Sequence, residues 1–306
     1  MKYSFKGISL VDLCSWFGLT RQAYYQSKHR VLQTAIEKEI LTLEIQHIRK
    51  KHKRLGGRKL FGRLEDFMHE HQIKMGRDAF FDLMRSGGML VRQRKKYHVT
   101  TDSNHWMRKY PNLIKEIEPM APNHIWVSDI TYWKTKGGHY YISFITDAYS
   151  RKIVGYHVAQ TMEAIESVYA LKMALKGIGT HASGLIHHSD RGSQYCSARY
   201  VELLRNNKIG ISMTENGDPL ENAIAERLNG IIKGEYLYDY QINSLDEAKK
   251  ILESVVKLYN EERPHSSINN MVPSQVHNGS LSKEVRRLWK NYYKKQELTV
   301  TEDEFL

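Results

Sequence analysis

The stretch HHSDRGSQYCS, residues 187–197, contains the acid that decides how this chain is interpreted. It follows the apolar pair Leu185 and Ile186, which is typical of a buried strand, and it places Asp190 beside a turn-forming Gly192. In open α/β sheets, functional side chains gather where strands end at their carboxyl edge. The stretch therefore predicts a strand that brings a carboxylate to such an edge. An Asp that caps a helix or a turn is the alternative interpretation.

The residues on both sides of this stretch predict an α/β domain. β-branched and aromatic residues mark strands at 125–134, 139–150 and 152–159, with a glycine turn at 136–138 between the first two. Then follow a helix at 165–178, a strand at 185–188, a helix from 197, a strand at 209–213 and a helix at about 222–237. This is the element order of a ribonuclease H-like α/β domain, although many α/β folds share parts of it.

Composition limits the class of protein. The chain has 306 residues, of which 41% are hydrophobic, so it can bury a sizeable core. No apolar run approaches the roughly 20 residues that span a bilayer, and the N-terminus has no signal-peptide pattern. Cys14 and Cys196 are far apart and belong to no CxxC pair, which fits a reducing cytoplasm and argues against a disulfide scaffold or a zinc finger.

Charge is distributed unevenly. The net charge is +12, and residues 1–122 contain 24 Lys and Arg against 12 Asp and Glu, whereas residues 123–306 contain 22 of each. A basic half joined to a neutral half suggests an arm that holds a polyanion and a body with another task. A charge bias that only improves solubility is the alternative.

The basic half is predicted to be helical. An apolar stripe over residues 10–17 ends at Gly18, and Thr20 can cap a second short helix through Tyr25, which outlines a helix–turn–helix. A longer helix is expected from about Leu32 to Lys51. The segment KKHKRLGGRKLFGR, residues 50–63, is densely basic and includes the candidate DNA-binding residues Arg58 and Lys59, and RQRKKYH, residues 92–98, is a basic strand or wing.

These patterns divide the chain into five parts. We expect a short helix–turn–helix-like segment at 1–39, a basic helix–turn–helix-like domain at 40–99, a linker at 100–122, a ribonuclease H-like α/β domain at 123–280 and a charged tail at 281–306. The linker holds three of the six prolines.

Two further acids accompany Asp190. Asp129 lies within a predicted strand, where Asp is rare and a buried charge is costly unless it is paired or holds a metal. Glu226 lies on the polar face of its helix, about 200° from the apolar Leu228 at 100° per residue. Alternatively, Asp129 could lie on the solvated face of an edge strand, and Glu226 could lie on a solvated helix face without a role in a site. Asp147 is a rival acid, but it precedes a turn, where a structural role is expected.

The carboxylates of Asp129, Asp190 and Glu226, on three separate elements, are suitable ligands for Mg²⁺. This ion keeps several water ligands and binds only a few carboxylates. Two such ions can activate a nucleophile and stabilise a leaving oxygen in phosphoryl transfer. His187 and His188 do not complete a zinc site, because no Cys or spaced second His pair lies nearby. We interpret them as residues that support the strand end.

Four segments with ordered spacing resemble the motifs of DDE transposases of the retroviral-integrase superfamily, in particular the orfB-type subunit of the insertion-sequence family 3 group. They are WVSDITYW (126–133), HSDRGSQYCS (188–197), ENAIAERLNGIIKGE (221–235) and YNEERPHSSINNMVPSQ (259–275). The resemblance covers roughly residues 120–280 strongly and 40–98 more weakly, where RLGGRKL replaces the aromatic-Gly-aromatic-Arg run of the family.

The resemblance implies a ribonuclease H-like integrase core behind a helical DNA-binding region. Asp129, Asp190 and Glu226 would be catalytic and hold two Mg²⁺, for which Mn²⁺ can substitute, while Lys233, seven residues beyond Glu226, would contact DNA phosphate. Water would cleave the element end, and the freed 3′-OH would attack the other end of the same element to give a circular intermediate. Ser189 and Gly192 would shape the turn at Asp190.

Arg263 and His265 are weaker DNA-binding candidates, because they could contact phosphate or only pack the turn at Pro264.

Partners follow from the same resemblance. They are double-stranded DNA, at the element's terminal repeats and at the target, a further copy of the chain on that DNA, and an orfA-type protein or its frameshift fusion. This chain has no sustained heptad stretch like that of the orfA-type segment. No membrane partner is expected, and the bacterial nucleoid within the cytoplasm is the expected location.

Two other functions are alternatives to a transposase. One is a non-catalytic DNA-binding regulator, and the other is a simple ribonuclease H-like nuclease, which would need no basic arm.

Overall fold

The computed structural model forms two compact units, Met1–Val91 and Arg92–Leu306. It describes residues 8–91, 105–135, 138–178, 184–215 and 219–279. The expected basic wing at 92–98, part of the glycine turn at 136–138 and the charged tail at 281–306 lie outside these residues. In the part of the chain that is described, no helix is both long enough and apolar enough to cross a membrane.

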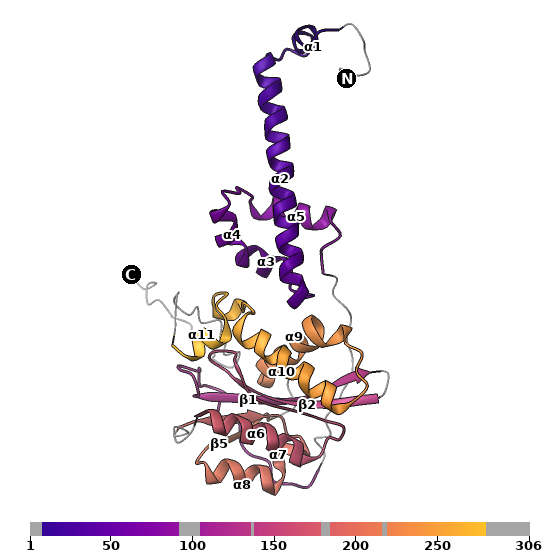
Figure 1. Ribbon diagram of the computed structural model, residues 1–306. Helices are drawn as coiled ribbons and strands as arrows, with labels where there is room; N and C mark the ends of the chain where they lie inside the picture. Colours follow the sequence, from indigo (N-terminus) through magenta and orange to yellow (C-terminus); the bar gives the residue numbers. More distant parts are fainter. Residues whose placement is uncertain (1–7, 92–104, 136–137, 179–183, 216–218, 280–306) are drawn as a thin grey trace, which may run out of the picture. The chain divides into compact units, whose positions relative to one another are not determined.

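The first unit is helical (Figure 1). Its helices are α1 (Leu10–Trp16), α2 (Arg21–Lys51), α3 (Gly57–Arg63), α4 (Glu65–Glu70) and α5 (Arg77–Ser86). Its core joins the C-terminal half of α2 to the three following helices, through residues such as Leu41, Ile45, Leu60 and Phe80.

The expectation of two helices between Thr20 and Lys51 is wrong. Thr20 does cap a helix, since its hydroxyl accepts a hydrogen bond from the Ala23 N–H at 3.0 Å. That helix then continues for 31 residues without a break, because no Gly or Pro interrupts it. The expected segment boundary between residues 39 and 40 therefore falls within α2.

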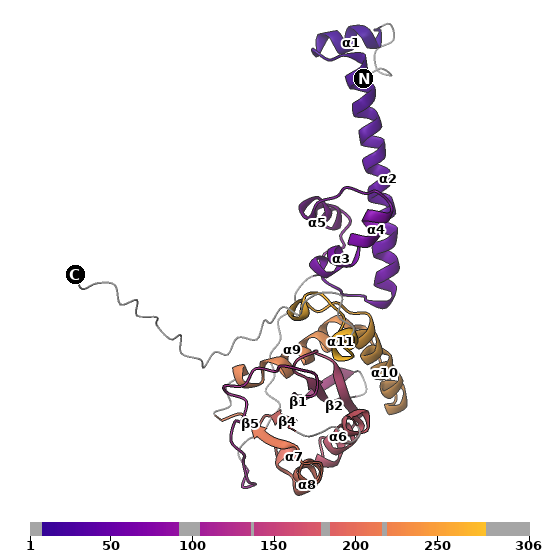
Figure 2. The same ribbon diagram turned by 90° about the vertical axis from the view of Figure 1, so that its left-hand side faces the viewer.

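The second unit is built on one five-stranded sheet, whose strands can be followed in Figures 1 and 2. Its strands are β1 (Ile125–Thr135), β2 (Gly138–Asp147), β3 (Ile153–Ala159), β4 (Ile186–Ser189) and β5 (Gly210–Met213), in the spatial order β3-β2-β1-β4-β5. The first three strands are antiparallel, and β4 and β5 run parallel to β1. This mixed topology confirms the predicted ribonuclease H-like α/β fold.

Helices cover both faces of the sheet. The α-helices are α6 (Ala164–Ile178), α7 (Ser193–Cys196), α8 (Ala198–Asn206), α9 (Ala223–Ile231), α10 (Leu245–Glu261) and α11 (Pro273–His277). The 3-10 segments are η1 (Pro219–Asn222), η3 (Leu237–Asp239) and η4 (Ser266–Ile268), and η2 (Ile232–Tyr236) is π-helical. One core packs α6, α7 and α8 against the sheet, around residues such as Trp126 and Tyr200. The other packs α9, η2 and α10 on the opposite face, around Phe144 and Leu252.

Gly155 explains how closely α6 approaches β3. A Cβ at this position would lie 2.3 Å from the Ala170 backbone oxygen and 2.9 Å from the Ala174 Cβ. Only glycine therefore permits this packing distance between the strand and the helix.

Candidate active site

Asp129 lies on β1, and Asp190 directly follows the neighbouring parallel strand β4. The register pairs Val127 with His188 and Ser128 with Ser189, so the two aspartates follow at the next position on each chain. Adjacent strands lie about 5 Å apart, which places both backbones at one point of the sheet. The parallel pairing of β1 with β4 thus brings together two acids that are 61 positions apart in the printed sequence.

Helix α9 brings the third acid to the same place. The Asn222 side-chain amide donates to the Ser128 carbonyl at 2.9 Å, and the Asn229 amide donates to Asp129 Oδ2 at 2.7 Å. Glu226 lies between these two residues on the polar face of the helix. Both asparagines share that face with Glu226, but no sequence pattern indicated a role for them, because their acceptors belong to a strand about 100 residues earlier.

The charges of these acids are coupled. Burial, the neighbouring Asp190 charge and the Glu226 charge together raise the pKa of Asp129 from 3.8 to about 7, against the hydrogen bonds from Ile130 and Asn229 that lower it. Asp129 Oδ1 accepts the Ile130 N–H at 2.8 Å. A carboxyl whose pKa lies this far above its ordinary value is stabilised near neutral pH by a bound proton or by a nearby cation.

The turn after β4 holds Asp190 in place. The Gly192 N–H donates to Asp190 Oδ1 at 3.0 Å, and the Ser189 hydroxyl donates to the Asp190 carbonyl at 3.0 Å. Tyr195 follows in the buried helix α7, and its hydroxyl has no hydrogen-bond partner within the described residues. Burial, the Tyr200 ring and the charges of Asp190 and Asp129 together raise the pKa of Tyr195. No sequence pattern indicated a role for Tyr195.

His187 and His188 are buried and bonded to neighbouring elements. His187 Nε2 lies 2.7 Å from the Ser128 hydroxyl and 2.9 Å from the Tyr200 hydroxyl, and His188 Nδ1 lies 2.8 Å from the Ser212 hydroxyl. Burial lowers the pKa of His187 to about 3 and that of His188 to about 4. Both rings are therefore neutral and tie β4 to the strands and the helix around it.

Asp147 has the structural role that its position before a turn predicted. Its carboxylate is fully buried and accepts hydrogen bonds from the Asn123 N–H, the Ser150 N–H and the Ser150 hydroxyl at 2.6 to 2.7 Å. Three protein donors satisfy this carboxylate, which stabilises the β2–β3 turn rather than a catalytic edge.

Lys233 lies beyond the end of the α-helix that carries Glu226. Helix α9 ends at Ile231, and Lys233 belongs to the π-helical segment η2, so the 100° step of an α-helix does not carry from Glu226 to Lys233. Its ammonium lies 4.3 Å from the centre of the Tyr132 ring on β1. This cation–π contact directs the lysine toward the strand that contains Asp129.

Arg263 and His265 are buried. Arg263 is 1% exposed, and its Nε and Nη2 atoms each lie 2.7 Å from a carboxylate oxygen of Glu235. His265 caps η4, since its Nδ1 accepts the Ser267 N–H and lies 2.8 Å from the Ser267 hydroxyl. In this conformation both residues face protein groups.

Arg58 and Lys59 lie in the first turn of α3, where Arg58 is exposed and Lys59 is half-buried.

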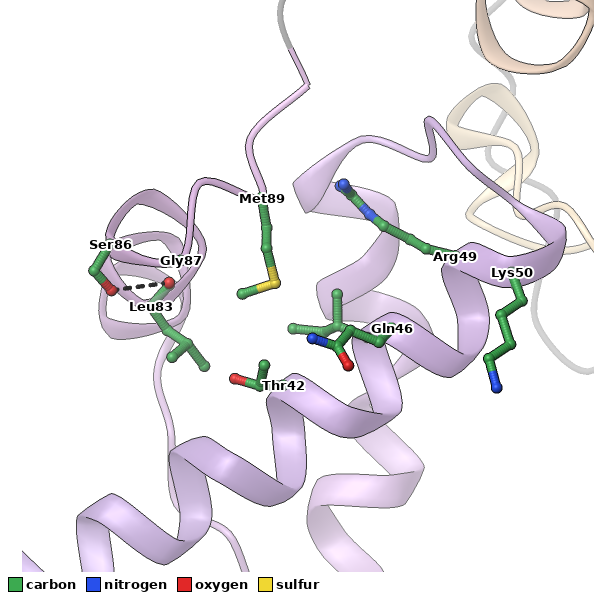
Figure 3. Close-up of a pocket in the computed structure, with 9 residues that line it drawn as sticks. Thr42, Gln46, Arg49, Lys50, Leu83, Ser86, Gly87 and Met89 are labelled. Atoms are coloured by element: carbon green, nitrogen blue, oxygen red, sulfur yellow. Dashed lines mark hydrogen bonds between the residues drawn. The ribbon is translucent and has the colours of Figure 1, made fainter. Parts of the chain in front are cut away.

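A pocket of about 470 Å³ lies between α2 and α5 in the same unit (Figure 3), and its wall includes Arg49 and Lys50. Arg49 donates to the Leu55 carbonyl at 3.3 Å, so its guanidinium already supports the fold. None of the predicted site residues lines this pocket.

The donor atoms at the sheet edge are of the kind that a hard cation such as Mg²⁺ prefers. Within the described ranges, no three His, Cys, Asp or Glu side chains form a ready cage for one ion. Mg²⁺ does not require such a cage, because it binds through one or two carboxylates, waters and substrate phosphates. The donors are carboxylates, and the buried Oδ1 atoms of Asn222 and Asn229, which lack partners in the described structure, could accept hydrogen bonds from water bound to an ion.

Comparisons with known proteins identify the domain. Integrase core domain models match residues 119–219 and 207–273. The "Insertion element IS600 uncharacterized 31 kDa protein" of Shigella sonnei is 36% identical over 269 residues, covering 86% of this chain and 96% of that protein. The "Transposase for insertion sequence element IS904" of Lactococcus lactis is 32% identical over 246 residues, covering 78% and 93%. The integrase catalytic core domain of HTLV-2, solved in complex with magnesium, aligns at 23% identity with a TM-score of 0.41 over 52% of this chain and 99% of that one.

A ribonuclease H-like sheet with coupled acids at its edge, matched by integrase core models, defines a DDE-type polynucleotidyl transferase, the enzyme class of transposases and integrases. The chain belongs to the insertion-sequence transposases that carry an integrase core domain.

Proposed function

We propose that this transposase cleaves DNA at the ends of its insertion sequence and joins the freed 3′-OH to a second phosphodiester, with Asp129, Asp190 and Glu226 as the catalytic acids. The observation that carries the proposal is the electrostatic coupling of Asp129 to Asp190 and Glu226, which come from three separate elements of the fold. Four carboxylates could have formed the site, and the fourth, Asp147, is already satisfied by protein donors.

The three acids would hold two Mg²⁺ or Mn²⁺ ions. When bound, such ions activate the attacking oxygen and stabilise the leaving oxygen of an in-line displacement. Asn229 would position Asp129 through its 2.7 Å hydrogen bond, and the Gly192 N–H would fix the direction of Asp190. In the first step water attacks the phosphodiester and releases a 3′-OH, and in the second step that 3′-OH attacks the other end of the same element and displaces its 5′ neighbour. No covalent enzyme intermediate is needed.

The first unit would bind DNA. Arg58, Lys59 and the neighbouring basic residues of segment 50–63 supply the positive charge that phosphate contacts need. An orfA-type protein, or a frameshift fusion with it, would complete recognition of the terminal repeats.

The direct test is an assay of cleavage and joining on candidate element ends, with Mg²⁺, with and without an orfA-type protein. The proposal expects nicks at the element boundary and joined products that carry the element's 3′ end. Binding of the ends without either product under every condition would instead favour a non-catalytic regulator.

The raised pKa of Asp129 predicts how stability depends on pH in the presence of a chelator. Because the pKa is about 7 in the folded protein against 3.8 ordinarily, the folded state binds more protons than the unfolded state between these values. The contribution of Asp129 to the free energy of unfolding should therefore fall as pH rises through this window, and level off above it. Thermal unfolding of wild type and Asp129→Asn from about pH 5 to about pH 8 measures this contribution.

In that experiment the stability of wild type relative to Asp129→Asn should fall as pH rises. Added Mg²⁺ should stabilise wild type more at the alkaline end, where the competing proton is lost. Parallel unfolding curves for the two proteins over the whole range would show that Asp129 does not titrate in this window.

Lys233→Ala should weaken binding of element ends and slow joining by on the order of tenfold, the effect of losing one exposed phosphate contact. The metal dependence of the remaining activity should be unchanged, because Lys233 contacts Tyr132 and is not among the proposed ligands. Lys233→Arg is the matched control, since it keeps the charge, and it should retain most of the binding. A Lys233→Ala protein with wild-type affinity and rate would make Lys233 a surface residue without a role in DNA binding.

A further inference from the structure

The N-terminal half of α2 exposes an apolar line that its own unit does not cover. In the 3-4 spacing of a coiled-coil seam, the positions are Tyr25, His29, Leu32, Ile36, Glu39 and Leu43. At about 100° per residue, all six lie within about 40° of one line along the helix. The four apolar members are between 45% and 60% exposed. We refer to these six residues as the α2 seam.

The α2 seam lies opposite the core of the unit. Leu41, Ile45 and Ile48 are buried against the neighbouring helices, and they lie about 140–200° around the helix from the seam. Leu43 therefore points away from the core even where α2 is packed. Figure 1 shows α2 continuing well beyond α3, α4 and α5. Helices this exposed draw their stability from packing, which implies that a partner covers the line.

We propose that the α2 seam pairs with the same seam of a second copy, in antiparallel orientation. In the register that places Leu32 against the partner's Ile36, Tyr25 meets the partner's Leu43. The two polar members then meet each other, since His29 lies against the partner's Glu39. Each apolar residue has an apolar partner and each polar residue has a complementary one.

Charge selects this orientation over the parallel one. A parallel pair would place Glu39 against the partner's Glu39 and His29 against the partner's His29, so that like groups meet in both polar layers. The antiparallel pair converts both layers into contacts between an imidazole and a carboxylate, with Lys28 beside the same carboxylate. The two polar positions also explain why the seam does not stand out as a heptad repeat in the sequence.

Sedimentation equilibrium of the full-length protein tests the surface. Wild type should show a reversible monomer–dimer equilibrium, and Ile36→Glu should weaken it on the order of a hundredfold, because the change disrupts two symmetry-related layers. Val31→Glu is the matched control. Val31 is 68% exposed on the same helix but lies about 120° from the seam, so this variant should dimerise normally. Far-UV circular dichroism checks that each variant keeps its helical content.

Charge exchange tests the orientation. Glu39→Lys should weaken dimerisation by on the order of tenfold, and adding His29→Glu to the same chain should restore it. In a parallel dimer the single change would replace one like pair by another, and the double variant would recover nothing. The proposal is overturned if wild type remains monomeric and associates only with an orfA-type protein, if Ile36→Glu dimerises like wild type, or if the double variant fails to recover.

Discussion

Replacing Asp190 with asparagine is expected to abolish both cleavage and joining, by on the order of 10³-fold or more, while DNA affinity stays close to wild type. Asparagine keeps the shape of the side chain and can retain the hydrogen bond from the Gly192 N–H, but it lacks the charge that holds a divalent cation. Removing this charge should also lower the pKa of Asp129, because Asp190 is the largest charged contribution to its increase. A joining time course on pre-cleaved ends, together with a binding titration, separates the two effects.

Asp246→Asn is the matched control for this experiment. Asp246 is exposed in the first turn of α10, and its conversion removes one negative charge without touching the sheet edge. This control should cleave and join at the wild-type rate. Normal joining by Asp190→Asn would remove Asp190 from the catalytic site, and a parallel loss of DNA binding would assign it a role in recognition.

Arg263→Leu is expected to lower the free energy of unfolding by about 3–5 kcal/mol, the usual cost of leaving one member of a buried ion pair alone. Arg263 is 1% exposed, and its guanidinium forms two bonds with the Glu235 carboxylate. Its removal takes this guanidinium away from the Glu235 carboxylate, which lies in the same π-helical turn as Lys233. Urea unfolding followed by circular dichroism measures the change.

The double variant Arg263→Leu with Glu235→Leu identifies the cause. Replacing both members of a buried pair with apolar groups is often close to neutral, so this variant should recover most of the lost stability. Stability equal to wild type in the single variant, combined with weaker DNA binding, would contradict this account and favour the phosphate contact that the sequence left open for Arg263.

Local patterns predicted the fold because its strands carry strong signals. The β-branched run that contains Asp129 and the apolar pair before Asp190 each mark a strand without reference to the rest of the chain. The order of the elements then places both acids at one edge of the sheet. The three proposed site acids could therefore be chosen from the sequence, although their coupling depends on the β1–β4 register, which no local pattern contains.

Long-range bonds explain what the sequence could not predict. Arg263 pairs with Glu235, which is 28 residues away, and Asn229 bonds Asp129, which is 100 residues away. The π-helical turn at Lys233 has no Gly or Pro at its start to mark it, and Ile232, the first residue of the turn, is fully buried. Tertiary packing, rather than local preference, determines each of these features.

The central claim is that Asp129, Asp190 and Glu226 form one metal-binding site. Calorimetric titration of Mn²⁺ into wild type and into Asp129→Asn, Asp190→Asn and Glu226→Gln tests it without relying on activity. The account predicts that wild type binds Mn²⁺ and that each single variant binds at least about tenfold more weakly, the usual effect of losing part of a metal site. Three variants that bind Mn²⁺ as tightly as wild type would contradict it.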